Sequence, residues 1–110
     1  MGDEPPVLIL ICSERPPGGL DAGRMAGASV YPAIQNLMLA ARAKGIGSTM
    51  TTLHKAREQD IKKILGVPEH VETIALIPLG YPQGHWGRPK RKPAHEVTFW
   101  NHWGEKHLHL

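Results

Sequence analysis

A short basic string near the C-terminal end is the first candidate for binding chemistry in this sequence. Residues 87–93 read GRPKRKP, in which Arg88 directly precedes the first proline and Lys90 and Arg91 lie between the two prolines. Guanidinium groups form charge-assisted, bidentate hydrogen bonds with phosphate oxygens. The prolines restrict the backbone, which lowers the entropy lost on binding. The string predicts a site for one phosphate group; a solvated run of charges is the alternative.

A second candidate is the short segment Met50-Thr51-Thr52-Leu53, which is rich in threonine and extended in character. Backbone N–H and C=O groups of an extended segment can hydrogen-bond the edge of a heterocyclic ring without titrating. The segment therefore predicts a ring contact made by the main chain. The alternative, favoured when the segment is taken alone, is an ordinary Thr-rich strand.

The histidines and the single cysteine offer weaker candidates. His102, His107 and His109 cluster at the C-terminus, and His107 and His109 form a His-x-His pair. Such a pair binds a metal only with a third ligand and a fixed geometry, which a fraying tail does not offer, so we predict no metal site. His54 follows the Thr-rich segment and is interpreted as a surface histidine, with a position facing a ring as the alternative. Cys12 lies in an apolar run, which is typical of an inert core thiol. We assign no catalytic residue.

Length and composition limit the classes of function that are open to this chain. With 110 residues and a formal net charge of +3, it forms one domain at most, with a thin core. The basic excess is local, which suits one phosphate better than nucleic acid. No apolar run reaches the roughly 18–20 residues of a membrane helix. The acidic start MGDEPP is unlike a signal peptide, and a single cysteine favours the cytoplasm.

Apolar spacing and the Gly and Pro residues divide the chain into elements. We expect strands over about 7–12, 48–53 and 73–79, and helices over 30–44 and 55–65. Ser29 is expected to cap the first helix, and Gly45 and Gly66 are expected to end the two helices. The remaining segments are a loop over 13–27, an extended basic segment over 80–93, an aromatic segment over 97–103 and a fraying tail. The unbroken apolar run at 7–12 predicts a central strand covered on both faces. The many apolar positions of the first helix predict burial on most sides. Pro78 predicts that the third strand leaves the ladder near its end.

The order β-α-β-α-β predicts an α/β layered fold, followed by the basic segment and a C-terminal aromatic arm. Half of a doubly wound nucleotide-binding fold has the same order, but no GxGxxG follows the first strand. Trp100 and Trp103 at the aromatic end favour use of the arm as an interface, with a local cap over the core as the alternative.

Three blocks of the sequence, taken in order, resemble one known family. They are ASVYPAIQNLMLAARAKGIGSTMTTLH, LGVPEHVETIALIPLGYP and GRPKRKP, within a resemblance that covers about residues 7–103. Together they resemble the C-terminal half of the nitroreductase-like FMN-dependent oxidoreductases. The half that carries the family's Arg/Ser cluster for the flavin has no counterpart here. We therefore expect one partial domain over 1–110, with residues 104–110 as a tail.

The resemblance implies a nitroreductase-like α+β fold, bound FMN, and hydride transfer from NADPH or NADH to a small nitro or quinone-like acceptor. The flavin is then the catalytic group, and the protein places and tunes it. Family positions fall on the backbone of Met50, Thr51, Thr52 and Leu53 near the ring nitrogen N5, and on Arg91 at the FMN phosphate, with Arg88 or Lys90 assisting. The resemblance also implies a homodimer whose C-terminal arms embrace the partner.

Two other functions fit the same sequence. One is a truncated, non-catalytic remnant that dimerises or binds FMN weakly, and the other is a small nucleotide-binding α/β module. A flavin absorption band in the purified protein distinguishes the first interpretation from both of these.

Overall fold

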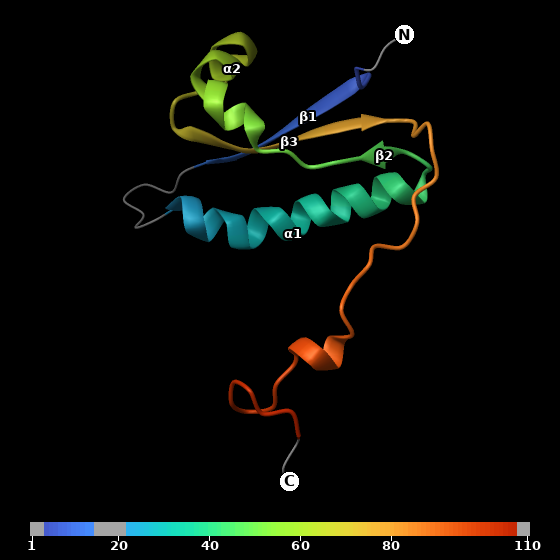
Figure 1. The fold of residues 1–110 in the computed structure, drawn as a ribbon. Helices are drawn as coiled ribbons and strands as arrows, with labels where there is room; N and C mark the ends of the chain where they lie inside the picture. Colours follow the sequence, from blue (N-terminus) through green and yellow to red (C-terminus); the bar gives the residue numbers. More distant parts are fainter. Residues whose placement is uncertain (1–3, 15–21, 108–110) are drawn as a thin grey trace.

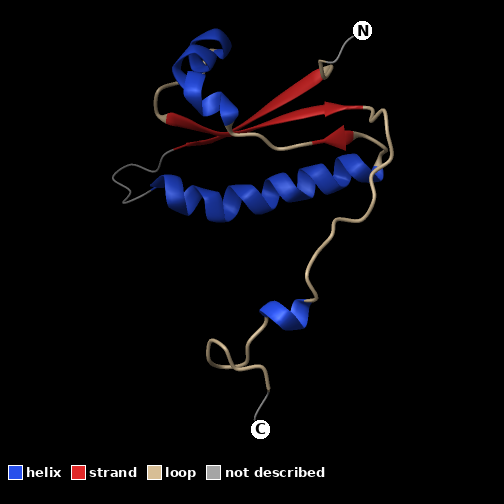
Figure 2. Ribbon diagram, viewed as in Figure 1, coloured by secondary structure: helices blue, strands red, loops and turns tan. Residues whose placement is uncertain are grey.

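The computed structural model describes residues 4–14 and 22–107. These residues form a small sheet that lies between two helices, followed by a long C-terminal arm (Figures 1 and 2). The elements, in chain order, are β1 (Val7–Glu14), α1 (Ala22–Ala43), β2 (Gly47–Ser48), the 3-10 helix η1 (Leu53–Arg57), α2 (Glu58–Leu65), β3 (Val71–Gly80) and the 3-10 helix η2 (Ala94–Val97). Helix α1 covers one face of the sheet and α2 lies on the other. The predicted β-α-β-α-β order and the layered fold class are confirmed.

The sheet is antiparallel and has the strand order β1-β3-β2. β1 pairs with β3 from Val7 opposite Leu79 to Glu14 opposite Val71, with a register shift between Ile11 and Cys12. An antiparallel sheet excludes the parallel, doubly wound alternative. The prediction that 7–12 is a central strand is wrong, because β3 has that place. An apolar run reports burial of side chains and does not tell which strand has two neighbours.

Pro78 stays within β3, opposite Leu8, so the prediction that the strand leaves the ladder there is also wrong. In a strand, the N–H and C=O groups of one residue point to the same side. The Pro78 carbonyl accepts the Thr49 N–H at 3.4 Å, so the missing Pro78 N–H lies on the β2 side. β2 is only two residues long, and the loss of one donor on that side costs little.

Helix α1 is longer and less buried than its sequence indicates. It begins at Ala22, seven residues before the predicted cap at Ser29. The described residues of the predicted 13–27 loop belong to β1 or to α1, so the loop prediction is wrong for them, and its residues 15–21 lie outside the described residues. Its buried side is one stripe with helical spacing, formed by Ile34, Leu37, Met38 and Ala41, while Leu39 is 56% exposed. The expected burial on most sides is wrong, because the alanines that suggested it mostly face solvent.

The core is thin, as the chain length predicts. Its fully packed centre joins Ile34 of α1 to Ile74, Ala75 and Ile77 of β3. Partly buried apolar side chains surround it: Ile9, Ile11, Val30, Leu37, Met38 and Leu79. No helix in the described part of the chain has both the length and the apolar character needed to cross a bilayer.

The arm, residues 81–107, leaves the sheet after β3 and extends past the end of α1 (Figure 1). Trp86 anchors its start, with the Arg42 guanidinium 4.9 Å from the centre of its ring. Further along, the rings of Phe99 and Trp103 meet edge to face at 4.8 Å. Lys106 donates to the Glu96 carbonyl at 2.6 Å, so the described part of the tail folds back onto η2 instead of fraying. The predicted tail residues 108–110, His109 among them, lie outside the described residues.

Candidate functional site

The segment Met50–Leu53 lies at the edge of the sheet, between β2 and η1. Thr51 forms a two-way backbone bridge with Leu76 of β3, with N···O distances of 3.0 and 2.9 Å. Met50 is 42% exposed and Leu53 is 84% exposed. The predicted strand over 48–53 is therefore a two-residue strand followed by one bridge, and its outer edge is open.

Free backbone donors on this edge fit the edge of a flavin ring. Thr49 and Thr51 direct their N–H groups to β3. Because successive residues of an extended chain point to opposite sides, the N–H groups of Met50 and Thr52 face outward. No hydrogen bond among the described residues engages these two N–H groups. An exposed pair of donors beside apolar side chains is what a planar heterocycle with ring nitrogens and carbonyls requires.

The predicted phosphate ligands lie on the arm. Arg88, Lys90 and Arg91 are all exposed, and the Arg91 guanidinium donates one hydrogen bond, to the Lys90 carbonyl at 3.2 Å. The Arg91 Nη1 atom makes that bond within the string itself, so the cationic groups face solvent. This donor set has the charge and the exposure that a phosphate group needs.

A single copy of the chain does not bring these two groups of residues together. Met50–Leu53 lies beside the sheet, whereas residues 88–91 lie on the arm, after it has left the sheet (Figure 1). The structure thus places both predicted groups on the surface and on separate parts of the molecule.

An open hollow of about 440 Å³ lies where β2, β3 and the start of the arm meet. Pro6, Gly47, Pro78, Tyr81 and Trp86 are among the residues that line it. Trp86 packs so closely on Gly47 that a Cβ atom there would lie 2.6 Å from its ring. None of the seven predicted site residues lines this hollow, so its walls are an addition to the sequence prediction.

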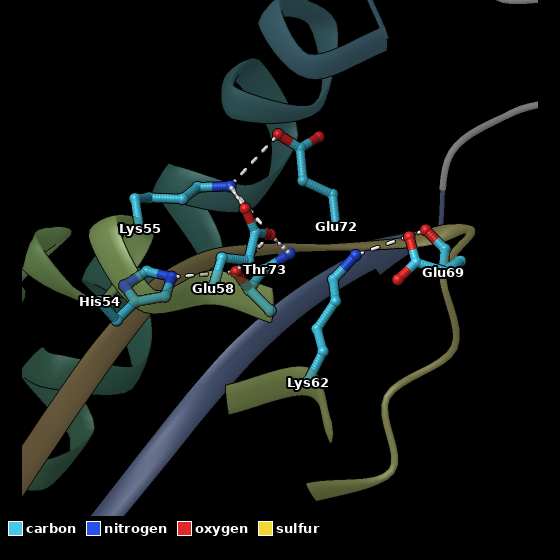
Figure 3. A network of polar contacts seen from close by, with 7 residues as sticks. All are labelled: His54, Lys55, Glu58, Lys62, Glu69, Glu72 and Thr73. Carbon is cyan, nitrogen blue, oxygen red and sulfur yellow. Dashed lines mark hydrogen bonds and ion pairs between the residues drawn. The ribbon is translucent and has the colours of Figure 1, made fainter. Parts of the chain in front are cut away.

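A polar network behind Met50–Leu53 was missed by the sequence prediction (Figure 3). His54 is only 6% exposed, and its Nε2 atom lies 3.0 Å from the Thr73 hydroxyl. The interpretation of His54 as a surface histidine is therefore wrong. The Thr73 hydroxyl lies 2.7 Å from the Glu58 carboxylate, and the Thr73 N–H donates to the same oxygen at 3.1 Å. Its sequence neighbours do not reveal Thr73, which is 19 residues away.

The network has a marked electrostatic effect on Glu58. The hydrogen bond from the Thr73 hydroxyl, with smaller contributions from the Thr73 N–H and from Lys55, lowers the pKa of Glu58 to about 2, against the opposing effect of burial. Lys55 also forms an ion pair with Glu72 at 3.4 Å, so η1, α2 and β3 are joined by charge as well as by hydrogen bonds.

Cys12 and Lys62 lie near this network without a role in it. Cys12 is exposed, so its interpretation as a core thiol is wrong; partial desolvation nevertheless raises the pKa of the thiol, which disfavours the nucleophilic thiolate. Lys62 is 3% exposed and donates to the Glu69 carbonyl at 3.4 Å. Among the described residues, no three His, Cys, Asp or Glu side chains gather as metal ligands would.

Comparison with known sequences shows which family this chain is similar to. The sequence model of the Nitroreductase family matches residues 1–81, a range that includes Met50–Leu53 and the network behind it and stops before the basic string. A protein of Methanothermobacter thermautotrophicus, whose name proposes an NADH dehydrogenase or NAD(P)H nitroreductase, is 32% identical over 84 residues. That match covers 74% of this chain and 43% of the relative.

Solved structures agree with the family match. NfrA2 of B. megaterium superposes with a TM-score of 0.78 over 91% of this chain and 47% of its own, at 17% identity, which shows the shared fold. A structure of oxidized iodotyrosine deiodinase bound to FMN and 3-iodo-L-tyrosine gives a TM-score of 0.60 at 28% identity, over 78% of this chain and 42% of its own.

The chain spans less than half the length of the curated relatives that it matches. Within that span, the sequence match covers both helices, all three strands and the open edge of the sheet. The chain belongs to the nitroreductase family.

Proposed function

We propose that this chain acts as an FMN-dependent NAD(P)H oxidoreductase of nitroreductase type, which transfers hydride to a small nitro or quinone-like acceptor. Family membership supports this proposal, as does the FMN bound in the iodotyrosine deiodinase structure. The observation that carries it is the pair of outward N–H groups of Met50 and Thr52 on the open edge of the sheet. A cytoplasmic location stays a prediction from the sequence.

The flavin, when bound, supplies the hydride chemistry. The chain's own groups bind and orient it. The N–H groups of Met50 and Thr52 would donate to the ring edge, while the bridge between Thr51 and Leu76 keeps the segment in place. Arg91, with Arg88 or Lys90, would hold the phosphate through charge-assisted hydrogen bonds. Neutral backbone donors suit the ring because they do not titrate near neutral pH.

We further propose that two copies complete the site. Since the ring segment and the basic string lie apart within one copy, the arm of one chain would bring its phosphate ligands to the sheet edge of the other. The exposure of Trp103, 92%, supports a role for the arm in such a homodimer.

The proposed flavin contact is tested by titrating the purified chain with FMN and with riboflavin, which lacks the phosphate. Arg91→Ala should weaken FMN binding roughly 10- to 100-fold, the worth of one or two charge-assisted hydrogen bonds. It should leave riboflavin binding unchanged. Lys63→Ala, which removes an exposed positive charge on α2, is the matched control. Equal FMN affinity for Arg91→Ala and wild type would refute the phosphate assignment.

A non-catalytic protein that dimerises and binds FMN is the second candidate, because within one copy the ring segment and the basic string lie on separate parts of the molecule. Oxidation of NADH or NADPH, followed with FMN and a nitro or quinone acceptor present, separates the two. Turnover supports the oxidoreductase, whereas FMN binding without turnover supports the second candidate.

A further inference from the structure

The hydrogen-bond network behind Met50–Leu53 places a hydrogen on the Nε2 atom of His54. The Thr73 hydroxyl has one hydrogen, and the charged Glu58 carboxylate, 2.7 Å away, can only accept. The Thr73 oxygen must therefore accept from His54, so the Nε2 atom of the ring carries a hydrogen. The Nδ1 atom is buried without a hydrogen-bond partner among the described residues.

The network also limits the freedom of the ring segment. Two anchors tie this part of the chain to β3: the backbone bridge of Thr51 to Leu76 and the side-chain bond of His54 to Thr73. Only Thr52 and Leu53 lie between the anchors. The Thr51 hydroxyl accepts the Leu53 N–H at 3.2 Å, which leaves the outward Thr52 N–H on a short, pinned loop.

The second anchor is held from behind by α2. Glu58, in the first turn of α2, accepts from both the N–H and the hydroxyl of Thr73. Lys55 of η1 lies 3.3 Å from the same carboxylate. The hydroxyl of Thr73 is therefore the point at which β3, η1 and α2 meet, and its position sets that of the His54 ring and of the backbone that precedes it (Figure 3).

We propose that His54, through Thr73 and Glu58, is a positioning residue that aims the backbone N–H group of Thr52 at the flavin ring. This inference rests on the proposed flavin contact at that segment.

Thr73→Val tests the proposal, because it removes the hydroxyl at nearly constant volume. Amide hydrogen exchange without flavin should be roughly tenfold faster at Thr51 and Leu53, as expected when the His54–Thr73 hydrogen bond that anchors the segment is lost. Affinity for FMN and for riboflavin should fall by the same factor, because the ring contact is shared. Thr73→Ser should restore both properties. Thr98→Val, which removes a hydroxyl that bonds the Ala94 carbonyl on the arm, is the matched control.

The outcomes separate this inference from the proposed function. Absence of flavin binding by the wild-type chain would refute the flavin contact and with it the aiming role. Flavin binding with unchanged exchange and unchanged riboflavin affinity in folded Thr73→Val would refute the positioning role alone.

A measurement on the unaltered protein covers the case in which Thr73→Val does not fold. The ¹⁵N NMR signal of the His54 Nε2 atom should show a directly bonded hydrogen. A bare Nε2 would contradict the network and overturn the proposal.

Discussion

The hydroxyl of Thr73 joins three elements of this molecule, β3, η1 and α2, through hydrogen bonds. Thr73 is fully buried, it accepts from a buried imidazole, and it donates to a carboxylate that also receives its own N–H. Nothing in the residues around His54 or Thr73 predicts their contact, because it depends on how η1 lies across β3. The candidate ring segment could be predicted from composition and resemblance, but its support could not.

Glu58 makes the stabilising effect of this network depend on pH in the acidic range. Its folded-state pKa of about 2 lies below the ordinary value of 4.5, so its stabilising effect is complete above about pH 4.5 and is lost as the pH falls through about 2. Glu58→Gln should lower the free energy of unfolding by up to about 3 kcal/mol at pH 7. The difference from wild type should disappear near pH 2. Urea denaturation at a series of pH values measures it.

Asp60→Asn serves as the comparison for Glu58→Gln. Asp60 lies on the same helix as Glu58, α2, and forms an exposed ion pair with Arg57 of η1. Such pairs contribute less than about 1 kcal/mol. A difference between wild type and Glu58→Gln that stays constant from pH 7 to pH 2 would contradict the assignment of the pKa shift to the Thr73 contact.

At the scale of elements, the local sequence predicts where helices end but does not predict which strands are neighbours in the sheet. Gly45 and Gly66, expected to end the two helices, both adopt positive φ angles, 77° and 71°. The start of α1 was misplaced because glycines and prolines precede it. The central place of β3 and the edge place of β1 could not be predicted, since they depend on pairing between distant segments.

The junction between β2 and the arm requires glycine at position 47, because the Trp86 ring occupies the space that a Cβ atom would need. Gly47→Ala would place a Cβ atom 2.6 Å from the Trp86 ring and 3.2 Å from the Gly80 carbonyl. The Trp86 ring must then shift from its place on Gly47. We expect a loss of about 1–3 kcal/mol in the free energy of unfolding. The Trp86 fluorescence should shift towards that of a more exposed ring.

Gly84→Ala is the control for the junction, because nothing lies within 4 Å of a Cβ atom at that position. Both substitutions are compared in a Trp100→Phe/Trp103→Phe background, so that Trp86 alone reports. Unchanged emission in Gly47→Ala would show that the ring does not pack against β2 in solution.

The whole molecule is extended for its length. Its radius of gyration is 18.7 Å, against about 13 Å for a compact domain of this size. The principal extents are 58 × 46 × 23 Å, and the longest reflects an arm that stands away from the sheet. An arm with exposed aromatic side chains gains burial only by packing against something else, which is consistent with the proposed exchange of arms between two copies.

Sedimentation equilibrium tests this prediction. The chain should have twice the mass of one copy at micromolar concentration, and Trp103→Ser should weaken the dimer roughly tenfold or more, since a buried tryptophan anchor contributes at least about 2 kcal/mol. Ile64→Ser, at an apolar position of α2 that is 80% exposed, is the control. If both substitutions weaken the dimer equally, the arm is not the main interface.

The central claim joins two distant places in the sequence: backbone donors at Met50–Leu53 and the guanidinium of Arg91. Titration of ¹⁵N-labelled chain with FMN, followed by NMR, tests it directly. We predict that the amides of Met50 and Thr52 and the Arg91 side chain respond together, at one affinity, and that riboflavin perturbs the amides alone. Saturation with FMN that leaves the amides of Met50 and Thr52 unperturbed would contradict the account.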